Sequence, residues 1–167
     1  AAAAGGAPVN VHTDLAIPEN LAGVEQAVSA HPKLQFVLAH LGWTAGPELI
    51  GRLLDAHPNL HTDMSIRLDP PGSLPWRNNG RDLSILRADN SFQPEWRALI
   101  ERHPDRFLFA SAYPLNALKP QLERFKALGW KDELLPKLFW RNAANALRLR
   151  ERSAFAASAQ WTGRLDD

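Results

Sequence analysis

The sequence predicts an α/β fold built from repeated units of one parallel strand and one helix. The first observation behind this prediction is a joint that occurs three times, at His31-Pro32, His57-Pro58 and His103-Pro104. Each joint follows a segment with apolar residues at helical spacing and is separated by one spacer residue from a short apolar segment. Because proline cannot continue a helix, each joint ends a helix and leads into a strand. Strands that alternate with helices of this length are typical of parallel βαβ units.

The second observation is the apolar run LQFVLAHLGW, residues Leu34–Trp43. A short apolar run bounded by Pro32 and Gly42 predicts a fully buried strand of a parallel sheet. His40 is the single ionisable residue of the run and stands at its carboxyl end. Parallel α/β folds place their chemistry at that end of the strands.

The first unit comprises the strand Val9–Asp14 and a helix that begins at Pro18, because proline is favoured at the first helical position. The apolar residues Leu21, Val24 and Val28 lie on one face of this helix. The remaining predicted strands are Leu34–His40, Leu60–Ser65 and Arg106–Ser111, and the remaining helices run from Pro47 to His57, Pro94–Arg102, Lys119–Leu128 and Glu133–Arg150. We therefore divide the chain into an undefined segment 1–7, one α/β region 8–150 and a tail 151–167.

Composition and charge exclude several classes of function. The 167 residues carry 19 basic and 18 acidic side chains, so the net charge of +1 leaves no excess to attract nucleic acid or acidic lipid. The chain has no cysteine, which excludes disulfides and thiolate metal ligands and leaves the cellular compartment open. No apolar run approaches the roughly 20 residues of a membrane helix. The start AAAAGGAP lacks the basic region and apolar core of a signal peptide.

Two histidines stand at the carboxyl ends of neighbouring predicted strands, His12 and His40. Neutral imidazole is a common ligand of zinc, nickel, iron and manganese, so the two side chains are candidates for a shared metal site. The alternative is that each is a core histidine whose nitrogen bonds a backbone carbonyl. Zinc sites use three or four protein ligands, and two histidines alone are therefore an incomplete site.

The repeated joint also predicts a register between the units. Ala112 follows Pro104 at the same distance as His40 follows Pro32. Ala112 therefore occupies, in the fourth unit, the strand-end position that His40 holds in the second.

A set of five motifs resembles the carboxyl-terminal half of the amidohydrolase-related metal-dependent hydrolases and decarboxylases, a (β/α)8-barrel family. The resemblance extends from about Pro8 to Arg150. The matching segments, in chain order, are PVNVHTD with His12, FVLAHLG with His40, the set Asn59, Asp63 and Ser65, the segment Phe109 to Pro114, and NAANAL from Asn142 to Leu147. The resemblance implies that the chain is the second half of a TIM (β/α)8 barrel.

The resemblance also implies a function. The complete protein is expected to be a metal-dependent hydrolase acting on a small organic acid, ester, lactone or amide, or a related decarboxylase. It implies His12 and His40 as ligands of a divalent metal, with zinc expected first and manganese, iron or nickel as alternatives. His40 is the implied catalytic histidine, and Asp63 is our candidate for the catalytic carboxylate in place of the family aspartate, whose position is Ala112. A non-catalytic, degenerate barrel that serves as a binding subunit is the rival interpretation.

Two departures from the family pattern matter. The family carries an H-x-H motif on its first strand and commonly another ligand on its fourth, and the residues before Pro8 contain neither. Ala112 stands where the family has an aspartate that contacts the metal and accepts a proton from water. Asp14 and Asp63 are possible substitutes, although a cap of the following turn and a structural hydrogen bond are the simpler roles. We expect the chain alone to be inactive and to need the missing half-barrel or a homo-oligomeric partner.

A long insertion, Ile66–Phe92, separates the third strand from the third helix. We interpret it as a lid in which Arg67, Arg77 and Trp76 contact a carboxylate-bearing substrate. The alternative is a solvated loop whose Trp76 covers apolar surface. Loops of this length are uncommon inside a compact unit unless they are functional or disordered, which favours the lid. Trp43 is a further candidate for substrate contact.

Overall fold

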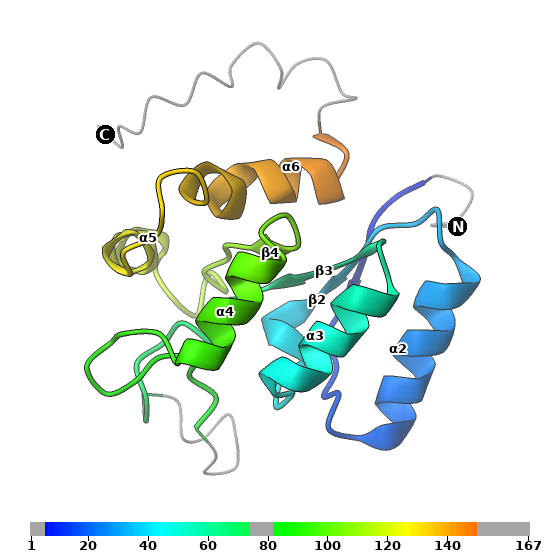
Figure 1. Ribbon diagram of the computed structural model, residues 1–167, viewed down its shortest axis with the longest axis horizontal. Helices are drawn as coiled ribbons and strands as arrows, with labels where there is room; N and C mark the ends of the chain where they lie inside the picture. Colours follow the sequence, from blue (N-terminus) through cyan, green and yellow to red (C-terminus); the bar gives the residue numbers. More distant parts are fainter. Residues whose placement is uncertain (1–5, 74–81, 150–167) are drawn as a thin grey trace.

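A single parallel sheet organises the computed structural model, which describes residues 6–73 and 82–149. The strands β1 (Val9–Val11), β2 (Phe36–Leu38), β3 (Leu60–Asp63) and β4 (Phe107–Leu108) lie side by side in sequence order, and each neighbouring pair is parallel. Figure 1 shows the helices that connect successive strands. The predicted α/β fold of parallel βα units is confirmed.

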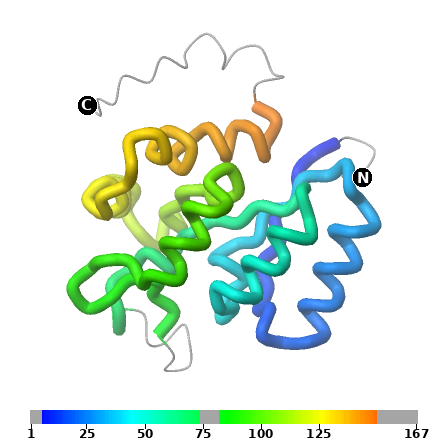
Figure 2. The backbone as a smooth tube through the Cα atoms, in the orientation of Figure 1, coloured from blue at the N-terminus to red at the C-terminus, as the bar shows by residue number. Residues whose placement is uncertain are grey.

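Three helices cover one face of this sheet (Figures 1 and 2): α2 (Pro18–Ala30), α3 (Pro47–Ala56) and α4 (Pro94–Arg102). Each begins with proline and is followed by a histidine of a His-Pro joint, as the sequence predicts. The strand side chains that face these helices are large and apolar. They form one buried cluster with the helices that includes Phe36, Leu38, Leu60, Phe107, Val28, Ile50, Leu53, Trp96 and Ile100.

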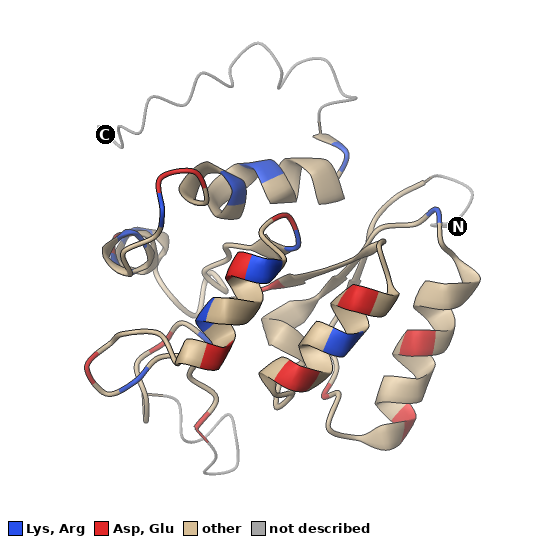
Figure 3. Cartoon of the chain, viewed as in Figure 1, with Lys and Arg blue, Asp and Glu red and all other residues tan. Residues whose placement is uncertain are grey.

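Charged side chains lie on the outer surfaces of these helices, and both signs are interleaved on α3 and α4 (Figure 3). Arg52 of α3 pairs with Glu25 of α2 at 2.6 Å, and Arg102 of α4 pairs with Asp55 of α3 at 3.3 Å. Exposed pairs of this kind contribute little to stability, about 0–1 kcal/mol each. No helix within residues 6–73 and 82–149 combines the length and apolarity that crossing a membrane requires.

The carboxyl-terminal part differs from the prediction. After α5 (Leu118–Ala127), the predicted helix Glu133–Arg150 is present as a continuous helical run over 135–146, but it contains a π-helical turn, η3 (Lys137–Arg141), before its last part, α6 (Asn142–Ala146). Arg150 lies outside the described residues. The carbonyl of Leu138 accepts a hydrogen bond from the backbone N–H of Phe109, 2.9 Å away, just past β4. The helix therefore supplies an acceptor to the edge of the sheet, which a periodic apolar pattern does not reveal.

The other face of the sheet carries smaller and more polar side chains. Asn10, Val37 and His61 are register partners on adjacent strands and therefore share this face. Ala146 of α6 packs against Val37 and Leu108. His61 is buried, its Nε2 lies 2.9 Å from Oε1 of Gln35, and its Nδ1 has no hydrogen-bond partner in the described residues.

Burial, together with the positive charge of Arg106, lowers the pKa of His61 to about 4. In the unfolded chain the pKa of a histidine is about 6.5, so between these two values the unfolded chain binds more protons than the folded chain. We expect the free energy of unfolding to fall by about 2–3 kcal/mol between pH 7 and pH 4.5 because of this group. Urea denaturation of the wild type and of His61→Gln at both pH values measures this loss. An equal loss in the variant would contradict the assignment to His61.

Candidate functional site

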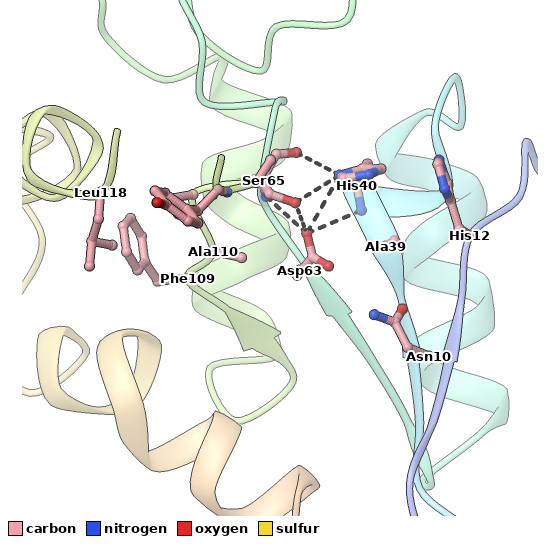
Figure 4. Close-up of a pocket in the computed structure, with 12 residues that line it drawn as sticks. Asn10, His12, Ala39, His40, Asp63, Ser65, Phe109, Ala110 and Leu118 are labelled. Atoms are coloured by element: carbon pink, nitrogen blue, oxygen red, sulfur yellow. Dashed lines mark hydrogen bonds and ion pairs between the residues drawn. The ribbon is translucent and has the colours of Figure 1, made fainter. Parts of the chain in front are cut away.

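His12 and His40 meet just beyond the carboxyl ends of β1 and β2. Their ring centroids are 4.9 Å apart, and the ring planes are nearly perpendicular. The Trp43 ring lies 5.6 Å from each of them. Figure 4 shows both imidazoles on one wall of a cavity, opposite Phe109 and Leu118. The structure therefore brings together the two histidines that the sequence singles out.

The cavity has a volume of about 550 Å³. His12, His40 and Asp63 line one side of it, and Ala112 lines it from the segment that follows β4. The register between the His-Pro joints thus places Ala112 at the same cavity as His40. The other residues of the lining are Asn10, Ala39, Ser65, Phe109, Ala110, Ser111, Tyr113 and Leu118.

A left-handed turn presents His40 to this cavity. The φ angles of His40, Leu41, Gly42 and Trp43 are all positive, at 55°, 55°, 68° and 65°. A left-handed conformation costs a residue with a side chain about 1–2 kcal/mol, so three of these four residues are strained. Strain of this kind persists only where surrounding contacts hold the backbone, and it is frequent at functional sites.

A chain of hydrogen bonds fixes the His40 ring. The Ser65 hydroxyl donates to Oδ1 of Asp63, and the same carboxylate oxygen accepts the backbone N–H groups of His40 at 3.2 Å and of Ser65 at 3.0 Å. Nδ1 of His40 lies 2.7 Å from the Ser65 hydroxyl oxygen. The single hydroxyl proton goes to Asp63, so Nδ1 of His40 must be the donor to Ser65. In the neutral ring, Nε2 then keeps its free lone pair.

The charge state of His40 agrees with this arrangement. Burial lowers its pKa below the usual value for histidine, and the charges of His12 and Arg67 act in the same direction. Asp63 and the hydrogen bond to Ser65 oppose the shift without cancelling it. Burial of His40 therefore favours the neutral form, in which imidazole binds a metal.

Asp14 has a structural position. Its Oδ1 accepts hydrogen bonds from the backbone N–H of Ala16 at 3.0 Å and from the Thr44 hydroxyl at 2.5 Å. It caps the turn after β1, as the sequence predicts, and connects this turn to the loop that follows β2. Oδ1 of Asp14 is thus bonded to Ala16 and Thr44, and Asp14 is not among the residues that line the cavity.

The predicted substrate residues of the insertion have different positions. Trp76 and Arg77 lie outside the described residues. Arg67 is buried, and its guanidinium donates to backbone carbonyls, so it does not line the cavity. The described part of the insertion includes Leu83–Leu86, and all four of these residues are buried. This part of the insertion is therefore packed into the fold and is not a solvated loop. Trp43 contacts both histidine rings, and its contact with substrate stays a prediction.

A family model described as amidohydrolase matches residues 1–149 of the chain. The chain belongs to the amidohydrolase family. No curated protein matches it.

Solved structures agree with this membership at the level of the fold. An uncharacterised TIM-barrel protein from Bordetella bronchiseptica aligns with a TM-score of 0.63 and 24% identity, over 90% of this chain and 49% of that protein. A zinc-bound amidohydrolase from Burkholderia multivorans aligns with a TM-score of 0.58 and 18% identity, over 88% and 54% of the two chains.

A dihydroxybenzoic acid decarboxylase from Polaromonas sp. JS666, solved with manganese and the inhibitor 2-nitroresorcinol, has a TM-score of 0.53 and 14% identity, over 89% of this chain and 52% of that one. This amidohydrolase chain thus spans about half the length of the structures that it matches. Its four parallel βα units are part of a (β/α)8 barrel, which confirms the predicted fold class.

The donor atoms present in the amidohydrolase chain fit only part of a metal site. His40 offers a free Nε2, and His12 lies beside it, whereas Oδ1 of Asp63 is already bonded to Ser65 and to the His40 backbone. Within residues 6–73 and 82–149 there is no group of three or more His, Cys, Asp and Glu side chains that would hold a metal ion. Further ligands would have to come from outside these residues.

The sequence prediction gave no role to Ser65 as the link between Asp63 and His40. A signal for it is present, because residues two apart on a strand face the same side and Asp63 and Ser65 have this spacing. The apolar wall made by Phe109 and Leu118 was also missed. These residues come from the segment after β4, and the sequence carries no signal that they face His40.

Proposed function

We propose that this chain is part of a metal-dependent amidohydrolase-family enzyme, to which it contributes His12 and His40 as metal ligands. The observation that carries the proposal is the orientation of His40. Nδ1 donates to Ser65, which in turn donates to Asp63, and within residues 6–73 and 82–149 no hydrogen-bond partner uses Nε2 of the ring, which lies beside His12 at one cavity. Histidines that bind metals commonly donate their other ring N–H in this way.

The proposed reaction is hydrolysis of a small organic acid, ester, lactone or amide. A divalent metal lowers the pKa of water that it binds, which is the chemistry that such a hydrolysis needs. The chain's own residues hold the His40 ring, place Trp43 beside both imidazoles and close one side of the cavity with apolar groups. Zinc is the first candidate metal, since one structural neighbour has zinc bound; another has manganese.

Two alternatives have a specific observation in their favour. A decarboxylase is supported by the manganese-bound decarboxylase among the structural neighbours. A non-catalytic binding subunit is supported by Ala112, whose side chain has no oxygen to accept a proton at the cavity. Both alternatives use the same cavity.

We further propose that a second half-barrel completes the fold, either from the same protein or from a partner chain. The four strands described here form an open sheet with edges at β1 and β4, and parallel sheets of this family close into a barrel. The missing units would contribute the remaining metal ligands.

The test is metal analysis and turnover of the protein with both half-barrels present. We expect about one or two divalent ions per complete barrel, loss of metal in His12→Ala and His40→Ala, and turnover of some member of a panel of small esters, lactones, amides and aromatic acids. Asp55→Ala on the outer surface of α3 is the control. Full metal content in both histidine variants, or metal-dependent turnover by the 167-residue chain alone, would overturn the proposal.

A further inference from the structure

We propose that Arg67 is a positioning residue for His40, which it holds by binding the carbonyl groups of the left-handed turn. The functional meaning of this inference rests on the proposed role of His40 as a metal ligand. The contacts themselves do not depend on that role. Arg67 therefore acts on the backbone of the site and not on the substrate.

The guanidinium spans the turn from one end to the other. Its Nη1 donates to the carbonyl of Trp43 and lies 3.4 Å from the carbonyl of His40. Both Nη atoms also approach the carbonyl of Ala45, at 3.4 and 3.5 Å. The bond to Trp43 is the close one, and the other contacts are long, so the guanidinium is centred on the end of the turn and extends to His40.

The Arg67 guanidinium is buried, and the groups in direct contact with it are backbone carbonyls and an aromatic ring. Arg67 is only 5% exposed, and its guanidinium lies over the Trp96 ring, 5.1 Å from the centroid. No carboxylate pairs with it within the described residues. A buried cation must be compensated by the groups around it. Here the groups in contact are backbone carbonyls and an aromatic face, and the carboxylates of Asp14 and Asp82 stabilise the charge from beyond ion-pair distance. The charge therefore favours the arrangement in which these carbonyls point at it.

The turn needs such a partner because its residues are in a strained conformation. His40, Leu41 and Trp43 have positive φ angles, and one backbone bond within the turn joins the Trp43 N–H to the His40 carbonyl. An outside donor that binds several carbonyls together stabilises the left-handed form against relaxation. A planar guanidinium with five donors suits this task, whereas a lysine ammonium does not offer the same fork.

Arg67 also connects the turn to the insertion. Its Nε donates to the carbonyl of Leu83, and its backbone carbonyl accepts from the Ile85 N–H at 2.9 Å. Its backbone N–H donates to the carbonyl of Ser65, the residue that orients the His40 ring. Arg67 thus joins three segments: its backbone bonds the strand end and the insertion, and its side chain bonds the insertion and the turn that carries His40.

The test compares Arg67→Met and Arg67→Lys with Arg106→Met in the 167-residue chain. Arg106 is the matched control because it also donates to backbone carbonyls, those of Leu60 and His57, but at the opposite end of the sheet. The first readout is amide hydrogen exchange of residues 41–45, with the β3 amides as the internal measure of global unfolding. The second is the ¹⁵N chemical shift of the His40 ring nitrogens at pH 7.5, which reports the tautomer.

We expect Arg67→Met to accelerate exchange in the turn at least tenfold relative to the β3 amides and to shift the His40 ring signals toward a tautomer mixture. Arg67→Lys should give a smaller change in the same direction, and Arg106→Met should give neither. If Arg67→Met does not fold, the lysine variant decides the question. The proposal would be overturned if Arg67→Lys had the same turn exchange and His40 ring shifts as the wild type. It would also be overturned if Arg106→Met changed both readouts as much as Arg67→Met does. Absence of metal from the complete protein would overturn only the proposed function.

Discussion

Replacing Gly42 with alanine is expected to lower the free energy of unfolding by about 2–5 kcal/mol. Two effects add at this position. The φ angle of Gly42 is +68°, which an L side chain adopts only with strain. A Cβ atom would also lie 2.6 Å from Cδ1 and 2.8 Å from Cγ of Leu15. Leu15 is only 1% exposed and has little room to move away.

Two other glycines separate these effects. Gly72 has a φ angle of +76° but open space around its Cα, so Gly72→Ala measures the backbone strain without a clash. Gly23 lies within α2, where its φ angle is not positive and a Cβ atom would meet no neighbour. Gly23→Ala should therefore slightly raise the free energy of unfolding, because alanine favours the helix. Urea denaturation followed by circular dichroism compares the three variants. If Gly42→Ala lowers the free energy of unfolding no more than Gly72→Ala does, then a clash with Leu15 is not the reason that position 42 requires glycine.

Local chemistry explains why most of the fold could be predicted from the sequence. Each His-Pro joint ends a helix for a reason contained in the two residues themselves, and α2, α3 and α4 all end one residue before such a histidine. The alternation of these helices with apolar runs then fixes a parallel sheet. Because the carboxyl ends of parallel strands meet at one edge, the proximity of His12 and His40 followed from the same pattern.

The parts that could not be predicted depend on contacts between distant segments. Nothing local in the sequence indicates that residues after His40 form a left-handed turn, since only Gly42 among them tolerates that conformation freely. An arginine in an insertion is expected to face solvent or a ligand, whereas Arg67 is buried against carbonyls of another loop. The π-helical turn in the last predicted helix includes Leu138, whose carbonyl accepts from the backbone N–H of Phe109, a residue just past β4.

The position of Ala112 provides the second large expected effect. Ala112 lines the cavity with His12, His40 and Asp63, and its φ angle is +58°. Among residues with a side chain, aspartate and asparagine are several-fold enriched in this left-handed region. An aspartate therefore fits the backbone here at least as well as alanine does. The family resemblance places an aspartate at the same position.

We expect Ala112→Asp to tighten zinc binding by the 167-residue chain about 10–100-fold, because a carboxylate joins two imidazoles at one cavity. The groups that hydrogen-bond to metal ligands are worth a similar factor in known sites, and a direct ligand should be worth at least as much. Ala112→Asn is the matched control, since it has the same backbone preference and size but no charge. Isothermal titration calorimetry with Zn²⁺ measures both. In the complete barrel the same substitution should raise the turnover rate by about 10²–10⁴-fold if the carboxylate accepts a proton from water. Equal zinc affinities for the aspartate and asparagine variants would mean that a side chain at this position does not reach the metal that His12 and His40 bind.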